Sequence, residues 1–298
     1  MRLIILIFSI LLTSLPASCE VNNTNTLPPF KTSGKISTTV QKYTGFTLFT
    51  RIIAESILNK YISNKTQAEH ANVDLKTYSG IDLIKRKLKS ANFDGENLLL
   101  QNIPIETLEI ALKDPISIKK IKKPNGRVKY DIEYPINGIA QAAINLNKTN
   151  EVINNLPKWK DRFNQINLPL PPFGSIKVKI TDFNISVDDY GKANIECGLT
   201  SLDDPTSSPL KIRFTGDIKI DEKKVFIKNI NSEIEDVFKE KSDLSNSFNK
   251  VLEDLINPIF DFSKYEKKGI KINTSELLFK DQKINLMLDF ILSSKETK

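Results

Sequence analysis

The chain contains very few residues that are suited to catalysis or to metal binding. His70 is its only histidine, so a typical zinc site would need carboxylate or cysteine partners. Asp188-Asp189 and Asp203-Asp204 are carboxylate pairs, but adjacent residues of a strand point to opposite faces, so neither pair is a ready acid–base dyad. Turn chemistry explains both pairs better. We therefore expect no catalytic residue, no metal site and no cofactor.

Sequence motifs of the common catalytic classes are absent. The chain has no glycine-rich phosphate loop, no Gly-x-Ser-x-Gly, no His-Glu-x-x-His and no Cys-x-x-Cys. Cys197 lies in an alternating segment and is expected to be a small buried apolar residue, because a nucleophile would need a positioned base. The sequence favours a protein that is not an enzyme, although a glycan hydrolase that uses only Asp and Glu stays open.

The N-terminus has the pattern of an export signal. A short positive start, Met1-Arg2, precedes an apolar run, and Ala17-Ser18-Cys19 places small residues at a cleavage site. Residues 1–19 are therefore predicted to be a signal peptide, which gives an exported protein of the periplasm or cell envelope. Lipid anchoring at Cys19 is the minority alternative, because Pro16 replaces the aliphatic residue expected there. Residues 20–38 read as a flexible polar linker.

The formal net charge of +7 is moderate, and no nucleic-acid-binding motif accompanies it. Two basic clusters stand out, and they are candidates for contact with a lipid headgroup or an anionic membrane surface. Their residues are Lys85, Arg86 and Lys87 in the first and Lys119 and Lys120 in the second. The plainer interpretation is a solvated strand edge or hairpin tip, where lysine also prevents aggregation.

Apolar residues at helical spacing predict two long amphipathic helices, at 40–62 and 244–256. Each carries an apolar stripe that is a candidate lipid-binding surface. The residues of these stripes that we single out are Phe46, Phe49, Ile53 and Ile57 in the first helix and Phe248, Leu252 and Ile256 in the second. Such stripes are most often ordinary core, so the alternative is a solid interior.

Most of the remaining chain alternates between apolar and polar residues, which is typical of antiparallel strands. Strands are predicted at 71–78, 91–100, 105–112, 116–121 and 128–134, and hairpins at 175–197, 210–230 and 270–292. Asp94-Gly95 is a turn signal within the second of these segments. A short helical insertion is expected at 147–163.

The order of these segments resembles the LmeA-like phospholipid-binding family of exported bacterial proteins. The resemblance is carried by Ala71–Thr77, by Asp82–Ile110 and by Asn257-Pro-Ile-Phe-Asp-Phe, and it covers about residues 45–292. In that family a segment of the form d-L-l-x-G-k precedes a strand ending near g-i-p-i. The chain departs from this pattern at 86–89, where the family places a glycine before the basic residue. The resemblance implies lipid binding in the cell envelope on a tubular lipid-binding-like fold, and no catalytic residue.

These observations predict an α+β protein, in which a strongly curved antiparallel sheet wraps around one or two long amphipathic helices. Residues 39–298 would form a single elongated domain with sub-regions 39–146 and 147–298. The expected function is non-catalytic binding, and possible shuttling, of phospholipid or another amphiphile, with transient contact to an anionic membrane surface. The alternative is a structural or adhesive envelope protein with a solid core and no ligand.

Overall fold

The computed structural model describes residues 27–100, 103–122, 126, 128–155, 164, 166–169, 174–203, 208–221, 223–234, 249, 253, 257–258, 260–266 and 269–294. The predicted signal peptide and Cys19 lie outside the described residues. Most of the predicted helix 244–256 lies outside them too, including Phe248, Leu252 and Ile256. What the sequence predicts for these residues stays a prediction.

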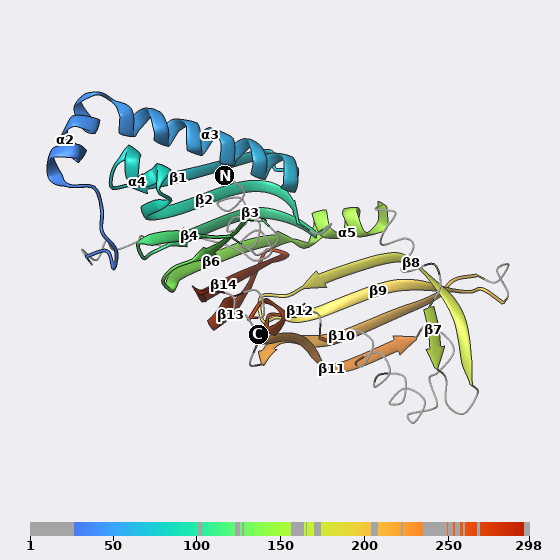
Figure 1. The fold of residues 1–298 in the computed structure, drawn as a ribbon. Coiled ribbons are helices and arrows are strands. Elements are labelled where there is room, and N and C mark those ends of the chain that lie inside the picture. Colours follow the sequence, from blue (N-terminus) through green and yellow to red (C-terminus); the bar gives the residue numbers. More distant parts are fainter. Residues whose placement is uncertain are drawn as a thin grey trace.

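The larger sheet is antiparallel and combines strands from the early and the late parts of the chain (Figure 1). Its order is β13-β14-β6-β3-β2-β4-β5, and β1 pairs with β2 off this path. The strands are β1 (His70–Thr77), β2 (Lys87–Leu100), β3 (Ile103–Leu112), β4 (Ile116–Lys122), β5 (Val128–Ile132), β6 (Ile136–Asn145), β13 (Ile270–Lys280) and β14 (Lys283–Leu292). Because the closing hairpin pairs with β6, the two halves of the chain share one sheet.

The smaller sheet is also antiparallel and has the order β12-β11-β10-β9-β8-β7. Its strands are β7 (Ile166–Pro169), β8 (Ser175–Val187), β9 (Lys192–Ser201), β10 (Leu210–Asp221), β11 (Lys224–Ile234) and β12 (Phe260–Asp261). In Figure 1 it lies beside the larger sheet, with α5 (Leu146–Asn155) at the junction. The three predicted hairpins and the α+β class, with mainly antiparallel strands, are confirmed.

Strand alternation separates a buried face from a solvent face, as the period of two requires. In β1, Val73 and Leu75 are buried, whereas Asn72 and Lys76 are exposed. Tight packing continues across the sheet, because a Cβ on Gly138 of β6 would lie 2.3 Å from the ring of Phe290 on β14. A side chain at position 138 would force this ring to move. At this point β6 and β14 are therefore closely packed.

Two details of the strand predictions were wrong or incomplete. Asp94-Gly95 does not form a turn but lies inside β2, where Gly95 is paired with Leu108 on one side and with Ala71 on the other. Ladders on both flanks outweigh the local turn preference of this dipeptide. The alternation predicts no strand at 136–145, where β6 lies between β3 and β14, and none at the short strands β7 and β12.

The predicted helix at 40–62 is two helices, α2 (Lys35–Tyr43) and α3 (Phe46–Thr66). They are separated at Thr44 and Gly45, and Gly45 adopts a φ of 69°, which a glycine accepts at no steric cost. Helix α2 begins inside the segment 20–38 that was expected to be a flexible linker. The helical part of the chain therefore starts earlier than the apolar stripe suggests.

The segment before α2 is fixed to the corner between β1 and α4 (Gly80–Ile84). Asp82 is 1% exposed, and both its carboxylate oxygens lie 3.1 Å from the backbone N–H of Ser33, which donates to them. The Ser79 hydroxyl donates to Asp82 over 2.7 Å and accepts from the Asp82 backbone N–H over 3.0 Å. This buried network satisfies the carboxylate, as a charge inside a protein requires.

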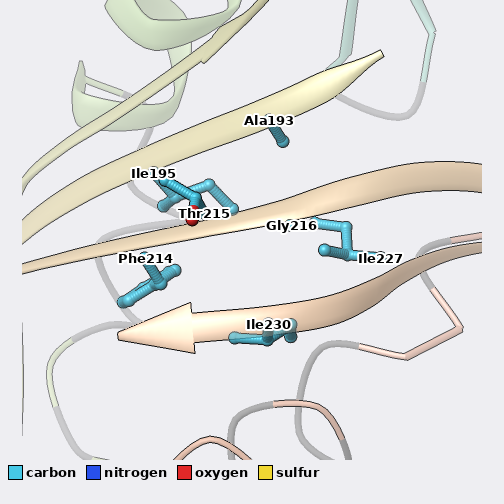
Figure 2. Close-up of a pocket in the computed structure, with 7 residues that line it drawn as sticks. All are labelled: Ala193, Ile195, Phe214, Thr215, Gly216, Ile227 and Ile230. Carbon is cyan, nitrogen blue, oxygen red and sulfur yellow. The ribbon is translucent and has the colours of Figure 1, made fainter. Parts of the chain in front are cut away.

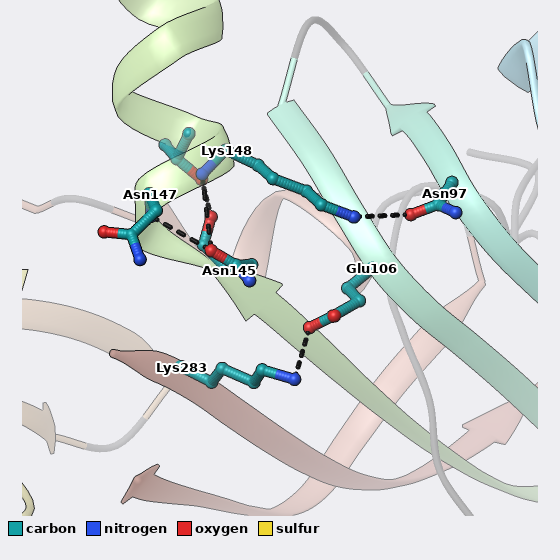
Figure 3. Close-up of polar contacts among 7 residues, drawn as sticks. Asn97, Glu106, Asn145, Asn147, Lys148 and Lys283 are labelled. Carbon is teal, nitrogen blue, oxygen red and sulfur yellow. Dashed lines mark hydrogen bonds and ion pairs between the residues drawn. The ribbon is translucent and has the colours of Figure 1, made fainter. Parts of the chain in front are cut away.

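Helix α5 connects the two sheets through side-chain amides. Its start is capped by the Asn145 carbonyl Oδ1, which accepts from the backbone N–H groups of Asn147 and Lys148 over 3.0 and 3.3 Å (Figure 3). One turn later, the Asn150 amide accepts from the Ile185 N–H over 2.8 Å and donates to the Ile185 carbonyl over 2.9 Å. Asn150 therefore replaces a missing strand partner at the edge of β8. The insertion predicted at 147–163 is helical as far as residue 155, and residues 156–163 lie outside the described part.

Candidate functional site

Helix α3 has one apolar side against the sheet and a second apolar side in solvent. Leu58 and Ile62 are 2% and 0% exposed and belong to the core that β1 and β2 share. The outward residues are Leu48 (54% exposed), Phe49 (63%), Ile52 (53%), Ile53 (43%) and Ile57 (37%), and we refer to these five as the exposed face of α3. A surface helix normally carries polar residues there. An exposed apolar stretch of this kind marks an interaction site more often than chance.

The structure places the predicted lipid-binding residues of the first helix at this surface. Phe49, Ile53 and Ile57 belong to the exposed face of α3, and Phe46 lies at the start of the helix, 37% exposed. They were expected to face the inside of the sheet. The inward stripe is instead formed by the neighbouring residues Ala54, Leu58, Tyr61 and Ile62.

Helix α2 adds exposed apolar side chains immediately before α3. Val40 is 56% exposed and Tyr43 is 88% exposed. Helix α2 contacts α3, so these two side chains lie on a neighbouring helix. Both helices therefore expose large apolar side chains to solvent.

A basic cleft lies beside the exposed face of α3. It has a volume of about 370 Å³ and is lined by Lys42, Thr47, Leu48, Arg51, Lys76, Thr77 and Lys89. We refer to these seven residues as the basic cleft. Leu48 belongs both to this cleft and to the exposed face of α3, so the apolar and the basic surfaces are continuous.

Three polar contacts position the walls of the cleft. The Glu55 carboxylate accepts from the Leu75 backbone N–H over 2.8 Å, which fixes α3 along the edge of β1. The Thr47 hydroxyl accepts from the Gly80 N–H over 3.1 Å, and the Gln41 carbonyl Oε1 accepts from the Ile81 N–H over 2.9 Å. Helices α2 and α3 are therefore held against the β1–α4 corner on the side where the cleft opens.

The basic cleft has four cationic residues and no acidic residue in its lining. Arg51 approaches Glu55, with 3.6 Å between Nε and Oε1, and Lys89 Nζ lies 5.4 Å from the centroid of the Tyr78 ring. Burial first, and then the nearby Asp82, raise the pKa of Tyr78, so its ring is a neutral phenol at pH 7. In the described part of the chain, Lys42 and Lys76 form no ion pair. Glu55 partly compensates Arg51, so positive charge exceeds negative charge in the cleft.

The predicted basic clusters divide into engaged and free side chains. Arg86 lies over the Tyr130 ring at 5.5 Å, and Lys87 Nζ lies 5.2 Å from the centroid of the Phe30 ring. Both side chains are half-buried, and each contacts an aromatic ring of another segment. Lys85 is exposed, and the second cluster, Lys119 and Lys120, is exposed on β4. No motif in the sequence marks the cationic residues of the basic cleft, because they come from separate segments: Lys42, Arg51, Lys76 and Lys89.

A second cleft, of about 450 Å³, opens on the smaller sheet and has mixed charge. Its lining residues are Asp182, Glu196, Cys197, Gly198, Pro209, Lys211, Ile212, Arg213 and Glu233. The Arg213 Nε donates to Glu196 Oε1 over 2.7 Å, and this hydrogen bond lowers the pKa of Glu196. Burial raises the pKa of Cys197 to about 11, so its thiol is neutral and weakly nucleophilic, as expected of a buried apolar residue. The lining of this second cleft contains both acidic and basic side chains, so it has no excess of positive charge.

Figure 2 shows a third depression, on the smaller sheet, between apolar side chains of β9, β10 and β11. Its lining residues are Ala193, Ile195, Phe214, Thr215, Gly216, Ile227 and Ile230, and it has no room for a water molecule. This part of the smaller sheet is therefore solid and cannot hold an acyl chain without moving apart.

His70, Asp188 and Asp203, which were considered for metal binding or catalysis, lie at or next to strand ends. His70 is exposed at the start of β1, and no group of three or more His, Cys, Asp or Glu residues that could hold a metal ion is found in the described part. The Asp188 carboxylate accepts from the backbone N–H groups of Tyr190 and Lys192 over 2.9 and 2.8 Å, which is the turn role predicted for it. Asp203 is exposed after β9.

Among the described residues, no helix is both long enough and apolar enough to cross a membrane. Comparisons of the chain with protein-family models, with curated proteins and with solved structures found no match. The interpretation of the site therefore depends on its own geometry: an exposed apolar helix face that continues into a basic cleft.

Proposed function

We propose that the protein binds phospholipid or another amphiphile without catalysing a reaction, and that it does so in the bacterial cell envelope. The observation that carries this proposal is the continuity between the exposed face of α3 and the basic cleft through Leu48. An amphiphile has an apolar part and a polar part joined in the same way. Shuttling of the bound molecule between membranes belongs to the same proposal.

The energetics favour an apolar ligand on α3. Burying an acyl chain contributes about 0.8 kcal/mol for each CH₂ group removed from water. The outward side chains Phe49, Ile52 and Ile53 are 63%, 53% and 43% exposed, so a ligand covering them would also remove their apolar surface from water. Both contributions are lost if the surface stays in solvent.

The resemblance to the LmeA-like family supports the proposal at one position. In the pattern d-L-l-x-G-k, Asp82, Leu83 and Lys87 match, and Arg86 stands where the family has glycine. Arg86 adopts a φ of 65°, in the left-handed region that favours glycine. The family turn is thus compatible with this backbone in spite of the substitution. A sheet that curves around α3 and the predicted helix 244–256, as in tubular lipid-binding domains, is part of the proposal.

A structural or adhesive envelope protein without a ligand is the second candidate. The solid packing between β9, β10 and β11 favours it, because that part of the chain has no room for a guest molecule (Figure 2). Under this alternative, the exposed face of α3 would serve contact with another macromolecule. The two candidates differ in whether a small amphiphile binds to the isolated protein.

Mass spectrometry of organic extracts from the purified protein, followed by lipid binding to the delipidated protein, separates the candidates. We expect co-purifying phospholipid, and we expect the double variant F49S/I53S to lose binding while its unfolding midpoint stays unchanged. The matched control is Y190S/L278S, which removes exposed apolar side chains, 95% and 56% exposed, far from α3 in the sequence. The proposal fails if no lipid co-purifies and none binds, or if both double variants bind equally.

A further inference from the structure

We infer that the basic cleft binds the phosphate group of an anionic amphiphile and so selects the headgroup of the ligand. The inference depends on the proposed function for the apolar part of the ligand, but the cleft makes a separate prediction about charge. The cleft is expected to bind anionic headgroups more tightly than zwitterionic or neutral headgroups. The supporting observations are the composition of the lining, its free hydrogen-bond donors, its volume and its position.

The composition of the lining is suited to an anion and unsuited to a cation. Lys42, Arg51, Lys76 and Lys89 bring four positive charges into about 370 Å³, and no carboxylate lines the same space. The only acid that approaches these four within ion-pair distance in the described part is Glu55, at 3.6 Å from Arg51 Nε. Like charges held this close repel one another, and a bound anion relieves that repulsion.

Hydrogen-bond donors in the cleft lack acceptors. The Arg51 Nε is buried 3.6 Å from the Glu55 carboxylate without a hydrogen bond, but the Arg51 side chain as a whole is 40% exposed, so its outer guanidinium N–H groups can reach a ligand in the cleft. The Thr47 hydroxyl accepts from Gly80 N–H, and its own hydrogen has no acceptor among the described residues. Guanidinium, ammonium and hydroxyl donors are the groups that recognise phosphate oxygens.

The volume and the position of the cleft fit a headgroup attached to acyl chains. A volume of about 370 Å³ lies in the range of roughly 300–1,000 Å³ that is usual for small-ligand sites. Because Leu48 lines the cleft and also belongs to the exposed face of α3, a phosphate in the cleft places its acyl chains along α3. Lys119 and Lys120 do not line this cleft.

The test compares two double variants that remove equal charge. K76Q/K89Q removes two of the four positive charges of the cleft, and K119Q/K120Q removes two exposed lysines of β4. Binding is measured by co-flotation with vesicles of phosphatidylcholine alone and with vesicles that contain equal parts of phosphatidylcholine and phosphatidylglycerol. We expect the wild type to prefer phosphatidylglycerol, and K76Q/K89Q to weaken that binding by about five-fold for each lysine removed. We expect the β4 control to weaken it by less than about two-fold in total.

Soluble ligands distinguish a lipid headgroup from free phosphate. Calorimetric titration uses inorganic phosphate and short-chain phosphatidylglycerol below its micelle concentration. We expect the short-chain lipid to bind more tightly than inorganic phosphate, and both to depend on Lys76 and Lys89. Tighter binding of inorganic phosphate would mean that the cleft serves a free anion instead.

Each outcome bears on one proposal or the other. If phosphatidylcholine and phosphatidylglycerol vesicles bind alike, or if both double variants lose the same affinity, the cleft does not select phosphate, although amphiphile binding stands. If no vesicle and no short-chain lipid binds, but inorganic phosphate binds in a way that requires Lys76 and Lys89, the proposed lipid function fails and the anion site stands. Circular dichroism on both variants checks that they are folded.

Discussion

The carboxylate of Glu55 on α3 accepts a 2.8 Å hydrogen bond from the backbone N–H of Leu75 on β1. Within the described sheet, β1 pairs only with β2, so its other edge has backbone donors without a strand partner. Unpaired edges invite pairing with other chains, and covering them with a helix prevents this. The same contact fixes the rotation of α3, and with it the stripe that faces solvent.

Replacing Glu55 by alanine leaves the Leu75 N–H without its acceptor. We expect E55A to lower the free energy of unfolding by about 1.5–3 kcal/mol, the range for a hydrogen bond to a charged group. E55Q keeps an oxygen acceptor at the same position and is expected to recover most of the loss. Urea unfolding followed by circular dichroism measures both variants. Equal stability of E55A and the wild type would show that the contact does not hold α3.

The two apolar sides of α3 predict effects of very different size when their side chains are truncated. Leu58 is 2% exposed, and L58A is expected to lower the free energy of unfolding by about 2–5 kcal/mol. Ile53 is 43% exposed, and I53A is expected to change it by less than about 0.5 kcal/mol. The comparison uses urea unfolding at one pH, without lipid. A large loss in I53A would mean that the exposed face of α3 is packed against something in the free protein.

The strands could be predicted from the sequence because their alternation is local. The hairpin 175–197, for example, corresponds to β8 and β9. Strand β6 was missed because Ala140, Ala142 and Ala143 give little contrast between its two faces, and its assignment comes from β3 and β14 on its flanks. Which strands pair across long separations, as β6 and β14 do, follows from tertiary packing and leaves no local signal.

The candidate site could be predicted only in part, for a physical reason. The apolar stripe Phe49–Ile53–Ile57 is visible in the sequence, but α3 is apolar on more than one side, so periodicity does not decide which side meets the sheet. In the structure, Leu58 and Ile62 pack in the core and Glu55 accepts from the Leu75 N–H, and together these contacts leave the other side in solvent. The basic cleft is formed where α2, α3, β1 and β2 meet, and neighbouring lysines in the sequence gave no sign of it.

Arg86 is predicted to hold backbone strain. Its φ of 65° is a conformation that a residue with a side chain adopts at a cost of about 1–2 kcal/mol. We expect R86G to be more stable than R86A by about 1 kcal/mol, because both lose the contact with Tyr130 and only glycine relieves the backbone. At Lys60, in the exposed middle of α3, the order is expected to reverse, with glycine about 1 kcal/mol less stable than alanine. Thermal unfolding of the four variants measures both differences.

Glu109 on β3 lies opposite Asp94 on β2, and the pair makes stability depend on pH. Burial first, and then the charge of Asp94, raise the pKa of Glu109 in the folded protein. Burial also raises the pKa of Asp94; a hydrogen bond from Asn72 opposes this rise, and the charge of Asp74 adds to it. A carboxyl group whose folded pKa lies above its unfolded value destabilises the fold when it is ionised. That destabilisation is complete above the folded pKa, decreases as the pH falls through it, and disappears below the unfolded value, about 4.3 for glutamate.

We therefore expect E109Q to raise the free energy of unfolding at pH 7 by about a few tenths of a kcal/mol, because the side chain is partly solvated. The gain over the wild type should shrink as the pH is lowered and vanish near pH 4, within about one pH unit. The control has the opposite sign. A hydrogen bond from Lys228 lowers the pKa of Asp221, so D221N is expected to lose stability at pH 7 and to approach the wild type in acid. Urea unfolding of the three proteins between about pH 2 and pH 7 measures both trends, because the lowered pKa of Asp221 places its transition below about pH 4. If E109Q and D221N both lower the free energy of unfolding at pH 7, the ionised form of Glu109 does not destabilise the fold.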